Sequence, residues 1–264
     1  MRPGQHEASF FTALSVMAYR QLKSFLRMKA RLVMSIGRPL LWLFFFGLGW
    51  SSTLRGPMAQ QVLKGMSFMD FVVPGVVMMS VFFTSFFAGS SVIWDREFGF
   101  LKEVMVAPAS RTAVILGRVL GDSLIAILQG VLTLAIAAPL LSQPPTWGLP
   151  LALSAMFLTA LAYASLGTAI GCSVNTIETF QLIHITLAMP MMFLSGAVVP
   201  LYTAPLWMKV ASVLVPLAYG VDAARTAISG VSLMPLWLDV AVLACLALAF
   251  LFIAVKAFEK TTPI

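Results

Sequence analysis

The chain has 264 residues, of which 60% are hydrophobic and 10% charged, whereas soluble domains average roughly 45–50% and 25%. This composition excludes an ordinary soluble domain and indicates a polytopic membrane protein. The net charge of +7 is compatible with nucleic-acid binding, but the basic residues are not interleaved with a soluble fold, so we read them as markers of membrane topology and expect no nucleic-acid partner.

Long uncharged runs favour helices over a barrel. Residues 123–177 contain no Asp, Glu, Lys or Arg, and neither do residues 179–208. About 20 apolar residues cross the hydrocarbon, and only helices or closed barrels cross it at all. Continuous apolar runs, rather than short alternating segments, predict an all-α polytopic membrane protein that forms one domain over residues 1–264.

Residues 1–31 are predicted to form a cytoplasmic amphipathic helix at the membrane interface rather than a signal peptide, because the apolar run comes late and no small-residue cleavage site follows it. Apolar residues at helical spacing are followed by basic ones, as in a helix lying among lipid headgroups. A basic tail that only sets orientation is the alternative reading. The apolar positions are Phe11, Leu14, Ala18, Leu22 and Phe25, and the basic ones are Arg20, Lys23, Arg27, Lys29 and Arg31.

Six transmembrane helices are predicted from the apolar segments that follow. They occupy about residues 32–54, 71–94, 112–141, 152–172, 180–199 and 238–255. The stretch 200–230 is only moderately apolar and is broken by Pro205, Pro216 and Gly220. Neither half is long enough to cross alone, so an external re-entrant hairpin of two short helices explains it better.

The positive charges orient these spans. With both termini in the cytoplasm, all but four of the 17 Lys and Arg residues lie on the cytoplasmic side, the exceptions being Arg55, Lys64, Lys209 and Arg225. This is the bias of the positive-inside rule. We therefore expect a multi-pass protein of the cell (plasma or inner) membrane.

A charged segment between the second and third spans is too long for a simple turn. Over residues 95–108, Leu101 shares an apolar stripe with Val104 and Met105, Glu97 shares a polar one with Lys102 and Glu103, and Pro108 ends the helix. A short amphipathic helix across the cytoplasmic ends of two spans is a surface on which a separate protein could act. Spacing alone equally allows a solvated helix lying on lipid.

Polar residues inside the spans are few, and no catalytic or metal-binding constellation is expected. Arg118 and Asp122 can pair on one helix face, in a structural role or at a gate. His184 is a bonded core histidine or, alternatively, a ligand or proton relay. The chain lacks GxxxxGK[ST], the phosphate-binding loop of many ATPases.

Two GxxxG patterns occur in the spans, Gly117 with Gly121 and Gly167 with Gly171. The pattern permits close approach of helices in lipid, but it is also common by chance. Both readings stay open at the level of sequence.

Several segments together resemble the ABC type-2 exporter permeases, nearest to the daunorubicin-resistance, nodulation-factor and polysaccharide-exporter branches. The resemblance covers essentially the whole chain, and no single motif would suffice. The segments are DFVVPG at Asp70–Gly75, REFGFLKEVMVAPASR from Arg96, GR at Gly117–Arg118, FLSGAVVPL at Phe193–Leu201 and VPLAYGVDAAR at Val215–Arg225.

The resemblance implies a six-helix membrane domain that works with a second permease copy, as a homodimer, and with two ABC ATP-binding subunits. ATP and Mg would be bound by those subunits, with no cofactor in this chain. The family's coupling helix maps onto Asp95, Arg96, Glu97, Phe98, Gly99, Leu101, Lys102 and Glu103, and its second cytoplasmic contact maps onto Val174, Asn175 and Glu178. The segment 173–179 departs from the pattern because it is very short and has no basic residue.

The predicted function is therefore the permease subunit of an ATP-driven exporter, without enzymatic activity of its own. It would move an amphipathic or lipid-like substrate, such as a drug, a lipid or a lipid-linked glycan, outward through the bilayer by alternating access. An ion-coupled secondary transporter and a membrane-embedded enzyme are the alternatives.

Overall fold

The computed structural model describes residues 9–27, 29–51, 62–100, 110–143 and 148–260. These residues contain helices and turns but no strand, which confirms the predicted all-helical fold. The helices are α1 (Phe10–Arg27), α2 (Lys29–Trp42), the π-helix η1 (Leu43–Leu48), α3 (Gly49–Ser51), α5 (Phe68–Ala88), α6 (Ser91–Glu97), α8 (Arg111–Ala137), η2 (Ala138–Leu140), α9 (Leu149–Ser173), α10 (Ile177–Leu194), η3 (Leu201–Thr203), α11 (Leu206–Ser212), α12 (Pro216–Ser229) and α13 (Leu236–Lys260).

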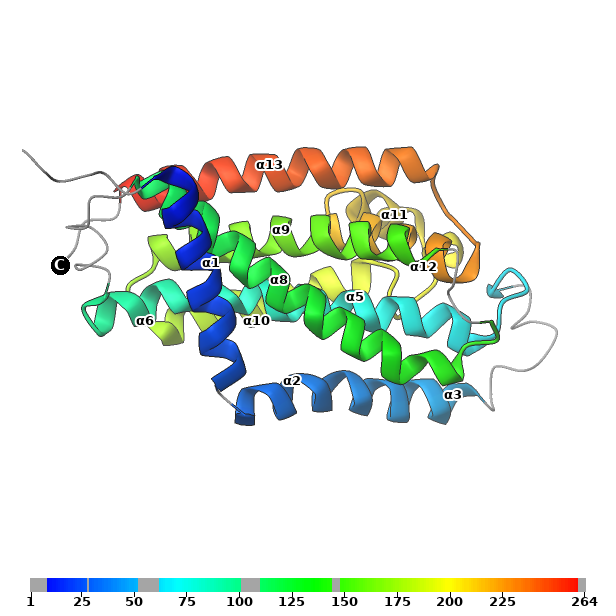
Figure 1. Cartoon of the computed structure of the whole chain (residues 1–264). Coiled ribbons are helices and arrows are strands. Elements are labelled where there is room, and N and C mark those ends of the chain that lie inside the picture. The colour runs from blue at the N-terminus through cyan, green and yellow to red at the C-terminus, as the bar shows by residue number, and fades with distance from the viewer. Residues whose placement is uncertain (1–8, 28, 52–61, 101–109, 144–147, 261–264) are drawn as a thin grey trace, which may run out of the picture.

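The long helices run side by side, and α1 lies across them at one end (Figure 1). Within the described ranges, five helical segments are long and apolar enough to cross a membrane, or six if the bent pair Leu206–Ser212 and Pro216–Ser229 is counted as one span. The five are Phe68–Glu97, Arg111–Leu140, Leu149–Ser173, Ile177–Leu194 and Leu236–Lys260. The first predicted span, 32–54, falls on α2, η1 and α3, whose apolar part, Ile36–Leu48, is shorter. The fifth span ends at Leu194, before the predicted limit at 199, because the chain turns at Gly196, where φ is +75°.

Helix starts are set by side-chain caps that the sequence carries. The Oγ of Ser67 accepts a hydrogen bond from the backbone N–H of Asp70 at the start of α5. Ser110 caps α8 and Thr176 caps α10 in the same way. Each cap satisfies a backbone donor that has no partner inside its helix, so the sequence defines where these helices begin.

Helix α5 lies at the centre of the bundle, where α8, α9 and α12 all pack against it. Most of its side chains are buried. Tyr163 on α9 is fully buried and packs edge-to-face on Phe82 of α5, with the ring centroids 4.5 Å apart. Its hydroxyl accepts the N–H of Leu217 at 3.1 Å, at the first turn of α12. Tyr163 therefore joins three helices through packing and one hydrogen bond.

Both GxxxG patterns form close helix contacts. A Cβ placed on Gly167 would lie 2.2 Å from the carbonyl oxygen of Phe86, and one on Gly171 would lie 2.4 Å from that of Gly89. On α8, a Cβ on Gly117 would lie 2.3 Å from the carbonyl oxygen of Leu14. Small residues let backbones approach in this way. The prediction that these glycines lie at helix–helix contacts is confirmed for contacts inside one chain. Helix α9 contacts α5, and α8 contacts α1.

The predicted hairpin region contains two short helices, α11 and α12, that meet at an angle of 93°. The two differ in surroundings. Most side chains of α12 are buried by protein, whereas Leu206, Trp207 and Val210 of α11 are exposed. Only α11 therefore presents an apolar surface outward, and α12 belongs to the bundle.

The close contact between α5 and α9 predicts opposite effects for two glycine substitutions. Gly167→Ala should lower the free energy of unfolding by about 1–3 kcal/mol, because the added methyl group overlaps the backbone of α5. Gly37→Ala in α2 meets no atom within 4 Å and should leave stability unchanged or raise it by up to about 1 kcal/mol. Thermal unfolding of the two purified variants in detergent measures the difference, and equal melting temperatures would contradict this packing.

Candidate functional site

At the α6 end of the bundle, the carboxylate of Asp95 joins three helices. One oxygen accepts from Arg20 of α1 at 2.7 Å, and the other accepts from Arg118 of α8 at 2.7 Å. Arg118 is only 2% exposed, and it also donates to the hydroxyl of Ser91. Removing one partner from such a buried pair leaves an uncompensated charge, so Asp95 fixes α6 against α1 and α8.

The spacing of Arg118 and Asp122 on one helix face predicted an ion pair between them. That prediction is wrong, because Arg118 forms its ion pair with Asp95. Side chains on a helix lean toward its N-terminus, which carries the guanidinium of Arg118 toward α6 and away from Asp122, one turn further along. Asp122 is buried at its own position on α8. The structure therefore pairs Arg118 with a different helix, and a role of either residue at a gate stays a prediction.

Arg96 ties α6 to the connection between α9 and α10. Its guanidinium donates to the carbonyl oxygens of Cys172 at 3.1 Å and Val174 at 3.0 Å, and to the side-chain oxygen of Asn175 at 3.3 Å. The described part of the predicted coupling segment, residues 95–100, and the second predicted contact, residues 174–178, thus meet through the side chain of Arg96. The short connection is held firmly although it has no basic residue of its own.

The next residues of the segment face outward. Glu97 is exposed and Phe98 is 77% exposed, and the ring of Phe98 stacks on that of Trp94, with centroids 5.8 Å apart and planes within 9°. Asn175 and Glu178 are exposed as well. We call these five residues the α6 surface. It combines a flat aromatic pair with two carboxylates, whereas Asp95 and Arg96 beneath it make the internal bonds.

Gly99 ends α6 with φ +77°, a conformation that favours glycine. The next residue, Phe100, lies beneath Arg20, whose guanidinium carbon is 3.6 Å from the ring centroid. Phe100 also packs against the small core cluster formed by Met17, Val114, Ile115 and Phe258. The chain therefore leaves α6 against α1. The remaining predicted coupling residues, Leu101, Lys102 and Glu103, lie outside the described residues.

His184 lies apart from both groups, on α10. Its ring is surrounded by those of four phenylalanines, Phe83, Phe86, Phe87 and Phe180, with centroids 4.9 to 6.3 Å away. Within the described ranges no three His, Cys, Asp or Glu side chains come together in a way that could hold a metal ion. Arg118 bonds to Asp95 and Ser91 and not to this aromatic group. The aromatic packing favours a core histidine, but its Nε2 has no hydrogen-bond partner among the described residues, so the expected bond to a neighbouring helix is not seen.

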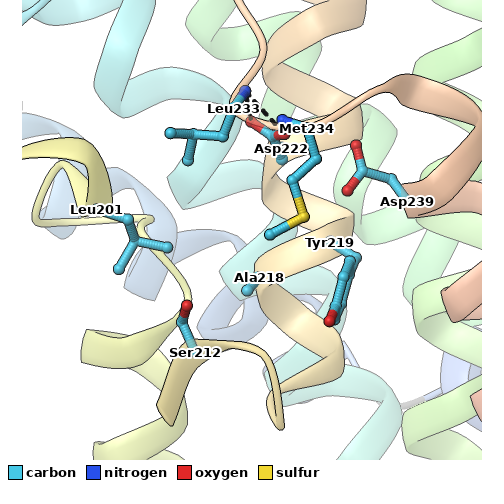
Figure 2. Close-up of a pocket in the computed structure, with 8 residues that line it drawn as sticks. All are labelled: Leu201, Ser212, Ala218, Tyr219, Asp222, Leu233, Met234 and Asp239. Atoms are coloured by element: carbon cyan, nitrogen blue, oxygen red, sulfur yellow. Dashed lines mark hydrogen bonds between the residues drawn. The ribbon is translucent and has the colours of Figure 1, made fainter. Parts of the chain in front are cut away.

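A second polar cluster, at the opposite end of the bundle, includes a residue that sequence reasoning missed. Asp222 of α12 is buried near Asp239, in the first turn of α13 (Figure 2). Arg225, one turn further along α12, is buried as well and is a cationic neighbour of Asp222. The guanidinium of Arg225 donates to the carbonyl oxygen of Gly196 at 2.8 Å. The sequence does place Asp239 in the first turn of the last apolar helix. An acid at that position is usually a solvated charge at the membrane interface, so it did not stand out.

Comparison with known proteins gives a consistent family. A family model described as ABC-2 type transporter matches residues 12–229. The chain is 28% identical to a putative transport permease, ycf38, of Cyanophora paradoxa, over 82% of this chain and 74% of that protein. It is 27% identical to the inner membrane transport permease YadH of Escherichia coli K12, over 75% of this chain and 77% of that protein. It is 26% identical to nodulation protein J of Rhizobium meliloti, over 88% of this chain and 86% of that protein.

The ion pairs of Asp95 predict a strong dependence of stability on this carboxylate. Asp95→Asn should lower the free energy of unfolding by about 3–5 kcal/mol, because Arg118 is left buried without its counter-charge. The matched control, Glu259→Gln, breaks the exposed pair with Lys256 and should cost less than about 1 kcal/mol. Denaturation of both variants in detergent checks this, and a similar small loss for both would show that the pair is not a structural link.

Proposed function

Because this chain belongs to the ABC-2 type transporter family, it is a multi-pass transport permease, and we propose that it is the membrane subunit of an ATP-driven exporter. In this proposal ATP and Mg are bound by a separate ATP-binding subunit, and the permease supplies the passage. The family and its relatives support a transporter rather than an enzyme.

The α6 surface is the observation that carries the proposal. Exposed aromatic side chains anchor many protein interfaces, and Trp94 and Phe98 form a stacked pair at the end of the bundle. The surface rests on a base fixed by the ion pairs of Asp95 and the hydrogen bonds of Arg96. A partner that docks here contacts side chains whose movement must be shared by the helices below.

Movement of the α6 surface would reach the bundle by two routes. Asp95 connects it to α1 and α8, and Arg96 connects it to the junction of α9 and α10. Alternating access requires two conformations that differ in their contacts with the ATP-binding subunit. We propose that ATP-driven closure of two such subunits moves the α6 surface and opens the passage outward.

The proposed assembly contains two copies of the permease, as a homodimer, and two ATP-binding subunits in the cell membrane. Both termini of the permease would lie in the cytoplasm, so that the α6 surface faces the nucleotide. The distribution of Lys and Arg supports this orientation, since only four of the 17 fall on the outer side. The substrate proposed is amphipathic or lipid-like, because charged side chains are scarce along the spans.

The α6 surface predicts uncoupling by substitutions that leave the fold intact. Phe98→Ala and Glu97→Ala should each weaken binding of the ATP-binding subunit by about tenfold or more, equivalent to 1.4 kcal/mol, and reduce ATP-driven transport accordingly. Glu259→Ala is the matched control, an exposed glutamate in the last turn of α13, and should bind normally. Affinity is measured with purified subunits, and wild-type binding and transport by both test variants would refute the docking assignment.

Reconstitution separates the exporter from an ion-coupled carrier. Vesicles that contain the permease and its ATP-binding subunit should transport a labelled lipid-like substrate only when ATP and Mg are supplied on the side of the α6 surface. Transport at the same rate by the permease alone, driven by an ion gradient, would refute the ATP-driven proposal and favour a secondary transporter.

A further inference from the structure

A small cavity lies between α12, the start of α13 and the segment that connects them. Its volume is about 20 Å³, enough for about one water molecule. Asp222 and Asp239 both face it, from α12 and α13, as Figure 2 shows. This cavity lies at the opposite end of the bundle from the α6 surface and takes no part in the function proposed above.

Asp222 has the surroundings of an ionised carboxylate. Its two oxygens accept hydrogen bonds from the backbone N–H of Leu233 at 2.9 Å, and one accepts from that of Met234, also at 2.9 Å. Arg225 and Lys64 are its cationic neighbours. Burial opposes the charge of Asp222, but hydrogen bonds donated to a carboxylate favour its charged form. Of the two acids, Asp222 is therefore the better stabilised as an ion.

Asp239 has the opposite surroundings. Its side chain is 0% exposed, and neither carboxylate oxygen has a hydrogen-bond donor in the described part of the chain. Its carboxyl group lines the same small cavity as that of Asp222 (Figure 2). A charge at this position would be buried, unpaired and next to a second negative charge, and each of these conditions disfavours ionisation.

Among the described residues, no cation is bonded to the carboxylate of Asp239. Arg225 donates to the carbonyl oxygens of Gly196 and Phe71, and Lys64 donates to the carbonyl oxygen of Ser232. The hydroxyl of Tyr219 donates to the carbonyl oxygen of Val213. Helix α9, which packs along α13, carries no Asp, Glu, Lys, Arg or His. Of the described neighbours, only the Asp222 carboxylate is left to hydrogen-bond Asp239.

We propose that Asp239 is a proton-binding site: its carboxyl group is neutral and donates its O–H to the carboxylate of Asp222, so that one proton holds the start of α13 against α12. When the pH rises, the proton leaves through the small cavity to water, and the two carboxylates then repel each other. The contact between the hairpin and the last helix is thus strong in acid and weakened in alkali. It operates without a nucleotide or an ATP-binding subunit.

Infrared spectroscopy of the purified permease tests the protonation directly. The wild-type protein should show the carbonyl band of a buried neutral carboxylic acid at neutral pH, and the band should disappear as the pH is raised. Asp239→Asn should lose this band at neutral pH, whereas Asp70→Asn should keep it, because Asp70 is a hydrogen-bonded acid near the surface at the same end of the bundle. Absence of the band in the wild type, or its persistence in Asp239→Asn, would overturn the proposal. The wild-type titration decides the question even if a variant fails to fold.

Thermal unfolding across the same pH range tests the contact. The melting temperature of the wild type should fall from mildly acidic to alkaline buffer, and that of Asp239→Asn should fall less, since an amide can donate to Asp222 at any pH. Parallel curves for the two proteins would overturn the proposal. A rise in the wild-type melting temperature with Ca²⁺ or Mg²⁺, absent from Asp239→Asn, would also overturn it, because a metal ion and not a proton would then bridge the carboxylates.

Discussion

The ion pairs of Asp95 with Arg20 and Arg118 are the constraint on which one end of the molecule depends. They join a helix that lies across the bundle to two that run along it (Figure 1). Because Arg118 is almost fully buried, none of the three can move away without exposing a charge to a medium that solvates it poorly. The outward position of Glu97 and Phe98 follows, since their neighbours Asp95 and Arg96 are committed to contacts inside.

Close contacts at glycines hold further helices of the bundle together. Lipid provides little hydrophobic drive for helices to associate, so close packing of backbones matters more than in water. Gly167 and Gly171 bring α9 onto the end of α5, and Gly117 brings α8 onto α1. The helices beneath the α6 surface are therefore packed in pairs through backbone contact. Close packing of this kind links the two helices of each pair along their backbones.

The sequence predicts the helical membrane fold well, because uncharged runs and prolines are local signals. It does not predict which charges meet. The spacing of Arg118 and Asp122 suggested a pair within one helix, but the partner is Asp95, on a different element. Asp239 was missed for a related reason: an acid within the first turn of an apolar helix is read as solvated, and only the position of α12 shows that it is enclosed. Contacts between distant segments set both outcomes.

The hydrogen bonds of Arg96 have a consequence for how this protein tolerates change. Two of its three acceptors are main-chain oxygens, those of Cys172 and Val174, and every amino acid supplies such an oxygen. Replacement of the side chain at either position leaves the acceptor in place, whereas replacement of the arginine removes all the donors. Genetic variation in the α9–α10 connection should therefore be far more permissive than variation at Arg96. Divergent copies of the gene can change that connection and still keep it attached to α6.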